Sequence, residues 1–278
     1  MTLNIKGSLF SLDSPQVMAI LNVTPDSFYP ESRKQTEEMI TAHIDKVLSE
    51  GASMIDVGGY SSRPNAAEVT PEEEMHRLSV ALDILNRHYP DVPVSVDTFR
   101  AGIAAKSVET YGASIINDIS GGELDEAMFE TVARLRVPYI LMHMRGTPKT
   151  MQQQTDYSDM MEEIMLYFAR KVEKLHLLGV SDIILDPGFG FSKTLDQNYQ
   201  LMKHLEEFQE FRLPLLVGIS RKSMIYKFLE TSPEESLNGT TVLNTFALLN
   251  GANILRVHDV KAAVEAVRIV NKITSADN

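Results

Sequence analysis

The chain has 278 residues, 44% of them hydrophobic, which is enough to bury a large core, and one domain of this length is typical of barrels and large α/β folds. Its net charge of -12 repels nucleic acid and anionic membranes, so we expect neither as a partner. The absence of cysteine excludes disulfides, zinc–thiolate sites and thiol nucleophiles. No basic leader and no apolar run of roughly 18 residues is present, so we expect a cytoplasmic protein.

Eight short apolar segments recur along the chain, and stretches with helical spacing of apolar residues separate them. Glycines such as Gly51 and Gly112 follow the helical stretches, as expected of the left-handed residue that ends a helix. Prolines such as Pro93 and Pro138 stand before the next apolar segment, because proline cannot continue a helix. The segments predicted as buried strands are residues 17–21, 53–57, 94–96, 114–116, 139–142, 183–185, 215–217 and 253–257.

The alternation of strand and helix predicts the fold. Eight such units in about 250 residues favour an α/β fold of the (β/α)8 TIM-barrel type over an open doubly wound sheet. We expect residues 1–278 to form a single domain, with the barrel spanning about 15–274. Residues 3–13 alternate weakly around Gly7, which predicts a short N-terminal hairpin that covers the barrel floor.

A polar side chain follows every predicted strand, where the βα loops of a barrel form a common mouth. One such Asp or Asn is more often a turn former or a helix cap, and we expect this structural role for Asp56 and Asp118. Eight strand ends with polar residues favour a binding site at the mouth. These residues are Asn22, Asp56, Asp97, Asn117, Asp118, His143, Arg145, Asp186, Ser220, Arg221, Lys222, Arg256 and His258.

Basic residues gather after the last two strands, whose loops bind phosphate in many barrels. Arg221 and Lys222 follow the seventh strand, and His258 follows the eighth. Arg256 lies within the eighth strand, where a purely structural residue would be apolar. The two loops together predict an anion-binding site, and Arg221 is either a part of it or a solvated surface charge.

Carboxylate and amide groups gather on the other strand ends. Asp97, Asn117 and Asp186 suit a flat heterocycle with adjacent N–H donors, because a carboxylate accepts two parallel hydrogen bonds. A divalent cation with oxygen ligands is the alternative for these residues. No zinc-ligand spacing is present, so we expect no tightly held structural metal. Lys222 could also be the Schiff-base nucleophile of an aldolase.

Seven motifs at the strand ends together resemble the dihydropteroate synthase family of folate biosynthesis. The match runs from about residue 15 to 272, and the motifs are weak alone but specific as a set. They are ILNVTPDSF (20–28), IDVGGYSSRP (55–64), SVDT (95–98), IINDI (115–119), DPGFGF (186–191), GISRKS (218–223) and RVHD (256–259).

The resemblance implies a transferase that condenses 6-hydroxymethyl-7,8-dihydropterin diphosphate with 4-aminobenzoate, giving 7,8-dihydropteroate and pyrophosphate. It also implies Mg²⁺ as cofactor, competition by sulfonamides, and a homodimer formed through the later helices. One rival is a pterin-binding methyltransferase domain, which would not need the basic triplet at 220–222 or the NVTPDSF motif. Another is an inactive homologue that binds pterin without turnover.

The resemblance assigns a role to each motif residue. Two loops depart from the family pattern, because Tyr60 stands where an acid is more usual and the loop after the first strand is shorter. The implied roles are Asp97, Asn117, Asp186 and Lys222 for the pterin; Ser62, Arg63, Arg256 and His258 for the diphosphate; Phe28, Pro64, Phe191 and Ser223 for 4-aminobenzoate; Asn22 for the metal; and Asp97, Asp186, Lys222 and Arg256 for catalysis.

Overall fold

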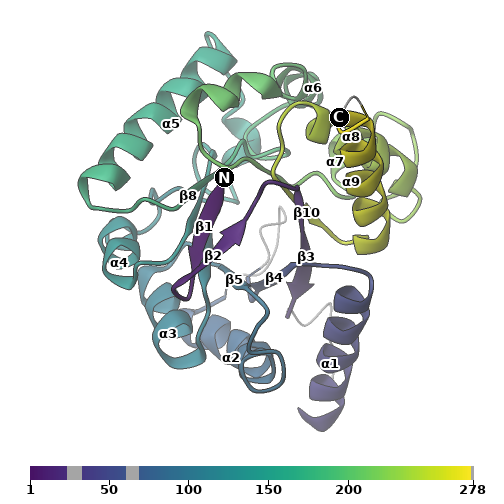
Figure 1. The fold of residues 1–278 in the computed structure, drawn as a ribbon. Helices are drawn as coiled ribbons and strands as arrows, with labels where there is room; N and C mark the ends of the chain where they lie inside the picture. The colour runs from purple at the N-terminus through teal and green to yellow at the C-terminus, as the bar shows by residue number, and fades with distance from the viewer. Residues whose placement is uncertain (24–32, 61–68, 277–278) are drawn as a thin grey trace.

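The computed structural model describes residues 1–23, 33–60 and 69–276, which form a barrel of parallel strands surrounded by helices (Figure 1). The strands are hydrogen-bonded in the order β8, β7, β6, β5, β4, β3, β10, β9. A parallel bridge between Leu185 and Leu215 joins the two ends of this order, so the sheet closes on itself. The barrel strands are β3 (Gln16–Asn22), β4 (Met54–Gly58), β5 (Val94–Asp97), β6 (Ile115–Asp118), β7 (Tyr139–Met142), β8 (Ile183–Asp186), β9 (Leu216–Val217) and β10 (Ile254–Val257).

The predicted barrel is therefore confirmed, and each observed strand overlaps one of the predicted segments. The helices lie outside the strands (Figure 1), and local signals mark several of their ends. Thr194 and Gln197 form a reciprocal capping box at one start, while Gly112 ends another helix with a φ of 71°. The helices are α1 (Arg33–Ser49), α2 (Pro71–His88), α3 (Ala101–Tyr111), α4 (Met128–Leu135), α5 (Met160–Leu177), α6 (Leu195–Lys203), α7 (Ser223–Tyr226), α8 (Leu237–Leu249) and α9 (Val260–Thr274), with 3₁₀ turns at Met151–Gln153 and Leu205–Phe211.

Alternation along each strand separates the core into layers, because successive side chains point to opposite faces of a sheet. Strand residues such as Val17, Ala19 and Leu21 pack outward in the large cluster shared with the helices. Their neighbours point into the barrel, where one strand residue from each of seven strands packs at the floor. These inward residues are Met18, Met54, Ile115, Ile140, Ile184, Leu216 and Ile254.

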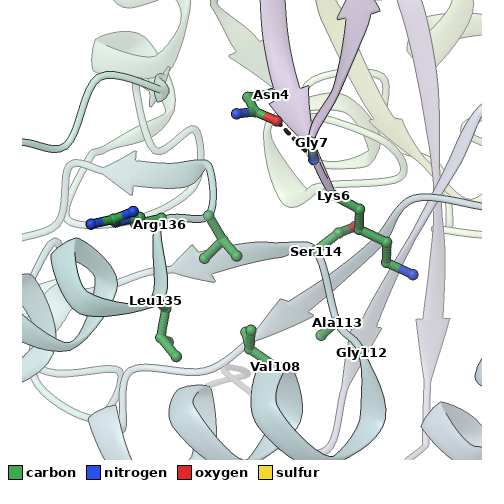
Figure 2. A pocket seen from close by; sticks show the side chains of 10 residues that line it. Asn4, Lys6, Gly7, Val108, Gly112, Ala113, Ser114, Leu135 and Arg136 are labelled. Atoms are coloured by element: carbon green, nitrogen blue, oxygen red, sulfur yellow. Dashed lines mark hydrogen bonds between the residues drawn. The ribbon is translucent and has the colours of Figure 1, made fainter.

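A hairpin of β1 (Thr2–Ile5) and β2 (Ser8–Ser11) seals this floor, as predicted (Figure 1). Leu3, Ile5 and Leu12 are buried against the inward floor residues. A cavity of about 320 Å³ remains between the hairpin turn and the ends of α3 and α4, lined in part by Lys6 and Arg136 (Figure 2). The cavity lies at the amino-terminal ends of the strands, so it is at the opposite face from the predicted mouth.

Asp118 has the structural role predicted for it. It follows the inward-facing Asn117, so its side chain points outward, and it is fully buried. Its carboxylate accepts hydrogen bonds from the backbone and hydroxyl of Ser120, the backbone of Gly122 and the hydroxyl of Tyr139, at 2.7 to 2.8 Å. These bonds attach the loop after β6 to β7.

We expect Asp118→Ala to lower the free energy of unfolding by about 3 kcal/mol, because the buried Tyr139 hydroxyl and the loop amides would lose their acceptor. Urea denaturation measures the change. Asp91→Ala, at an exposed position, is the control and should stay within about 0.5 kcal/mol of the wild type. Equal stability of the two variants would contradict this role for Asp118.

Candidate functional site

An arginine inside the barrel connects two carboxylates on neighbouring strands. Arg256 Nε donates to Asp56 Oδ2 at 2.6 Å, and Arg256 Nη2 donates to Asp97 Oδ2 at 2.9 Å. The arginine comes from β10, whereas the carboxylates come from β4 and β5, so the guanidinium reaches across β3. Among the described residues, Nη1 of this arginine makes no hydrogen bond and is available to a ligand.

Asp56 also orients Asn117. The amide nitrogen of Asn117 donates to Asp56 Oδ2 at 3.1 Å, which leaves the amide oxygen on the other side. That oxygen is buried and has no hydrogen-bond partner among the described residues, and the same is true of Asp56 Oδ1. An unsatisfied buried acceptor costs free energy, so a ligand with N–H or O–H donors would be stabilised here. Asp56 was predicted to be structural, and its contacts show that it also supports two site residues.

The loop after β8 forms the next part of the mouth. Asp186 ends β8, and its Oδ1 accepts from the amide of Gly188 at 2.8 Å. The carbonyl of Phe189 accepts a hydrogen bond from Lys222 Nζ, which lies 4.6 Å from the centre of the Phe191 ring. Lys222 therefore sits between a carbonyl and an aromatic face, beside Asp186.

The remaining candidate residues with described positions surround this group. Asn22 ends β3 opposite Gly58, where a side chain would begin 3.3 Å from Asn22 Oδ1. The hydroxyl of Ser220 accepts from the backbone amide of His258 at 3.2 Å, which joins the loops after β9 and β10. His258 is exposed, and Ser223 is half-buried as the first residue of α7.

Burial changes the acidity of these groups. It raises the pKa of Asp97 to about 7, although the neighbouring Arg256 guanidinium opposes the change. Burial also raises the pKa of Asp186, against the effect of the Lys222 ammonium. The pKa of Lys222 falls to about 8 because burial disfavours its charge more than Asp186 supports it. Such shifts are common where groups bind or transfer charge.

Three polar residues predicted at the mouth, His143, Arg145 and Arg221, have their contacts elsewhere. The prediction for His143 is wrong: it follows the inward-facing Met142, so its ring points outward and packs edge-on against Tyr167 at 4.9 Å. Arg145 pairs with Glu163 of α5 and lies 3.8 Å from the centre of the Tyr157 ring.

Arg221 has neither of its two predicted roles. Its Nε and Nη2 donate to both oxygens of Asp259 at 2.8 Å, and its Nη1 donates to the carbonyls of Pro233 and Glu234. The ion pair joins the GISRKS segment to the RVHD segment. Four hydrogen bonds commit this guanidinium to the scaffold, so the anion site is built from other cations.

Four predicted site residues, Phe28, Ser62, Arg63 and Pro64, lie outside the described residues. Tyr60, which replaces the more usual acid, is described and packs edge-on against Phe99 with ring centres 5.2 Å apart. Arg100 lies 5.7 Å from the Tyr60 ring centre and pairs with the fully buried Glu74. Tyr60 is thus part of an aromatic and cationic cluster beside β5.

Sequence reasoning missed Lys193, which is buried behind the loop after β8. Its ammonium lies 3.1 Å from each of three acceptors: His143 Nδ1, the Gly188 carbonyl and the Phe191 carbonyl. Burial lowers the pKa of Lys193 to about 7, against the attraction of Asp186. The only signal in the sequence was its place just after the DPGFGF motif, and a lysine after a loop is usually solvated.

The described residues offer few metal ligands at the mouth. They contain no group of three or more His, Cys, Asp or Glu side chains placed to hold a metal ion. Asn22 supplies a carboxamide, whose oxygen is a hard donor of the kind that Mg²⁺ accepts. Mg²⁺ often keeps several waters and binds through one or two protein groups plus substrate phosphates, so a single amide ligand fits this ion but not Zn²⁺.

Comparisons with known proteins agree with one another. Residues 18–258 match the family model described as "Pterin binding enzyme". The dihydropteroate synthase of Escherichia coli K12 is 42% identical over 278 residues, covering 99% of this chain and 98% of its own. The dihydropteroate synthase of Yersinia pestis, solved with a sulfonamide drug, has a TM-score of 0.91 and 42% identity, over 99% of this chain and 100% of that one. The Xanthomonas albilineans dihydropteroate synthase, solved with 4-aminobenzoic acid, has a TM-score of 0.90 and 35% identity, over 99% and 98% of the two chains.

The contact between Arg256 and Asp97 predicts a titration. Arg256→Met should raise the pKa of Asp97 by about 1 or more, because a nearby cation favours the carboxylate and the negative charge of Asp56 would then be uncompensated. Carbon-13 NMR of labelled aspartate carboxyl groups measures the change. Arg268→Met, at an exposed position of α9, is the control. The same Asp97 pKa in both variants would show that Arg256 does not set it.

Proposed function

This chain belongs to the dihydropteroate synthase family, which consists of transferases, and we propose that its barrel mouth condenses 6-hydroxymethyl-7,8-dihydropterin diphosphate with 4-aminobenzoate. The products are 7,8-dihydropteroate and pyrophosphate. The division of the mouth into an acceptor-rich side and a cationic side supports this proposal. The acceptors suit the pterin, and the cations suit the diphosphate.

The observation that carries the proposal is the set of acceptors around Asn117. Its buried amide oxygen has no partner among the described residues. The carboxylate of Asp97 lies at the end of the neighbouring strand β5, and that of Asp186 at the end of β8, two strands away on the other side. A pterin ring presents several N–H donors at one edge, so it can satisfy all three groups. Hydrogen bonds to charged groups contribute about 1.5 to 3 kcal/mol each. Lys222, beside Asp186, would donate to an acceptor atom of the same ring.

The diphosphate would lie on the β9 and β10 side of the mouth. Arg256 keeps one guanidinium nitrogen for a ligand while Asp56 and Asp97 hold the other two. His258 is exposed at the end of β10 and adds a donor. Ser62 and Arg63 are proposed for the same group by their motif, although their positions are outside the described residues. Cations here would stabilise the negative charge that grows on the leaving pyrophosphate.

Mg²⁺ would be held by the Asn22 carboxamide together with oxygens of the diphosphate, which agrees with the small number of metal ligands among the described residues of the mouth. When bound, the ion neutralises phosphate charge and favours departure of pyrophosphate.

The proposed mechanism needs no covalent nucleophile from the protein. The bond between the pterin methylene carbon and the diphosphate oxygen breaks, and the positive charge on the carbon is delocalised into the ring. The Asp97 and Asp186 carboxylates stabilise that cation, whereas Arg256 stabilises the pyrophosphate. Both effects are stronger in a mouth with little water. The amine of 4-aminobenzoate is largely neutral at pH 7, so its nitrogen forms the bond to the methylene carbon without a dedicated general base, and the ammonium that results releases its proton to water.

We propose Phe191, Ser223, Phe28 and Pro64 as the contacts of 4-aminobenzoate. Phe191 presents its ring beneath the Lys222 ammonium, at the outer side of the pterin pocket. Ser223 follows directly and offers a hydroxyl at the start of α7. An aromatic ring and a hydroxyl suit the ring and the carboxylate of this substrate, and they would also suit the sulfonamides that imitate it.

We also propose a homodimer formed through the later helices. Val242, Phe246 and Leu249 form an exposed apolar stripe on α8, and Ile269 and Ile273 form another on α9. The two helices pack against each other and lie side by side in Figure 1. Large contiguous apolar patches are uncommon on monomers, so this surface suits a protein interface.

The proposed partners are therefore the two small substrates and a second copy of the chain, without nucleic acid or membrane, and the proposed location is the cytoplasm. The net charge of -12 supports the absence of nucleic acid. In the described part of the chain, no helix has the length and apolar character needed to cross a membrane.

The activity has a direct test. We expect the protein to release pyrophosphate only when the pterin diphosphate, 4-aminobenzoate and Mg²⁺ are all present, as measured by a coupled pyrophosphate assay. Asp186→Asn should lower kcat/KM by about 100-fold or more, because the cation loses a carboxylate. The matched control is Asp182→Asn, at the opposite end of the same strand, which should stay within about twofold. Failure of the wild type to release pyrophosphate would refute the proposed activity.

The interface has a separate test. We expect the wild type to have twice the 31.1 kDa mass of one chain in light scattering after gel filtration. Phe246→Asp should weaken the dimer by about 100-fold, because a charge would be buried without a partner. Leu177→Asp, an equally drastic change at an exposed residue of α5, is the control and should remain dimeric. A wild-type monomer would contradict the proposed interface.

A further inference from the structure

Lys193 is an unusual residue to find in the interior, because its ammonium is buried and no carboxylate of the described residues is in contact with it. It is 3% exposed, and its three partners are neutral acceptors. Burying a cation in this way is costly, and an apolar side chain would fill the same space without that cost. The residue should therefore contribute something that an apolar side chain cannot.

The partners show what the ammonium holds. It donates hydrogen bonds to the carbonyls of Gly188 and Phe191, which lie near the two ends of a tight loop. Between them the carbonyl of Phe189 accepts a hydrogen bond from Lys222 instead. Loop 187–192 therefore lies between two lysines, with Lys193 behind it and Lys222 on the side of the mouth.

The loop in turn holds three groups of the proposed site. The Gly188 amide donates to Asp186 Oδ1, and the Phe189 carbonyl accepts from Lys222 Nζ. The Phe191 ring lies under the same ammonium. The fit is close, because a side chain at Gly190 would begin 3.2 Å from Lys222 Cδ. A shift of the loop backbone would thus move all three groups together.

We propose that Lys193 is a positioning residue for the condensation, which holds loop 187–192 from behind and so fixes Asp186, Lys222 and Phe191 in the mouth. It acts through the loop and touches neither substrate. The inference rests on the roles proposed above for those three residues, and no motif assignment includes Lys193 itself.

His143 completes the arrangement. Burial lowers its pKa well below the usual value, so the ring is neutral and one nitrogen is an acceptor. A charged Lys193 donates to Nδ1 and to the two carbonyls. Burial also lowers the pKa of Lys193, to about 7, and a neutral amine would keep both carbonyls while accepting from Nδ1–H of the other tautomer. The other titratable groups around the pair are Asp186, Lys222, Arg145, Tyr157 and Tyr167.

Lys193→Met tests the proposal, because methionine has a similar shape but no donor. We expect KM for both substrates to rise by about tenfold, and kcat to fall as well because a displaced Asp186 stabilises the pterin cation less, both measured by pyrophosphate release. The free energy of unfolding, from urea denaturation, should change little, since the lost hydrogen bonds are offset by the removal of a buried charge. A residue with only a structural role would change stability and leave KM unaltered.

Lys193→Gln keeps N–H donors for the carbonyls without the charge, so its KM should lie between those of the wild type and Lys193→Met. If Lys193→Met does not fold, the KM of Lys193→Gln alone tests the positioning role. Lys203→Met, at an exposed position of α6, is the control. Wild-type KM in a folded Lys193 variant would overturn the proposal. An inactive wild type would instead refute the activity, so the two failures can be distinguished.

Discussion

The charge balance inside the barrel is the constraint on which the site depends. Arg256 crosses the interior and pairs with both Asp56 and Asp97, so one guanidinium connects the carboxylates of two neighbouring strands. Even with this cation, burial keeps the pKa of Asp97 near 7. The mouth therefore contains both carboxylates and a cation, so it suits ligands that carry charge of both signs. A cationic pterin would offset the negative charge of the carboxylates, and a diphosphate would accept a hydrogen bond from Nη1 of Arg256.

This balance is possible because apolar and polar layers alternate along the barrel axis. The inward residues near the floor, such as Met54 and Ile115, are apolar and pack under the hairpin. Two residues later on the same strands the inward positions are Asp56 and Asn117, and the barrel becomes polar. The hydrophobic floor supplies the stability, so the upper layer can carry groups whose hydrogen bonds are completed by substrate.

In the loop after β8, backbone carbonyls connect Lys193 to the residues of the site. Its carbonyls at residues 188 and 191 accept from Lys193 and its carbonyl at 189 accepts from Lys222, so two lysines hold one turn. Gly188 makes this possible with a φ of 73°, and a side chain there would begin 2.0 Å from the His143 carbonyl. Gly188 is thus required by a close backbone contact.

The sequence by itself determined the fold class, the strands and the family, because strand and helix periodicity and the order of the motifs are local properties of the chain. Alternation could even have placed His143, since it follows the inward-facing Met142 and must point outward. Only the tertiary structure decided which charges pair: Arg221 with Asp259, Arg256 with Asp56 and Asp97, and Lys193 with loop carbonyls. These contacts join residues 38, 200, 159 and 5 positions apart, and their partners depend on strand order and on the direction of single carbonyl groups. Neither property is encoded in the local pattern of residues.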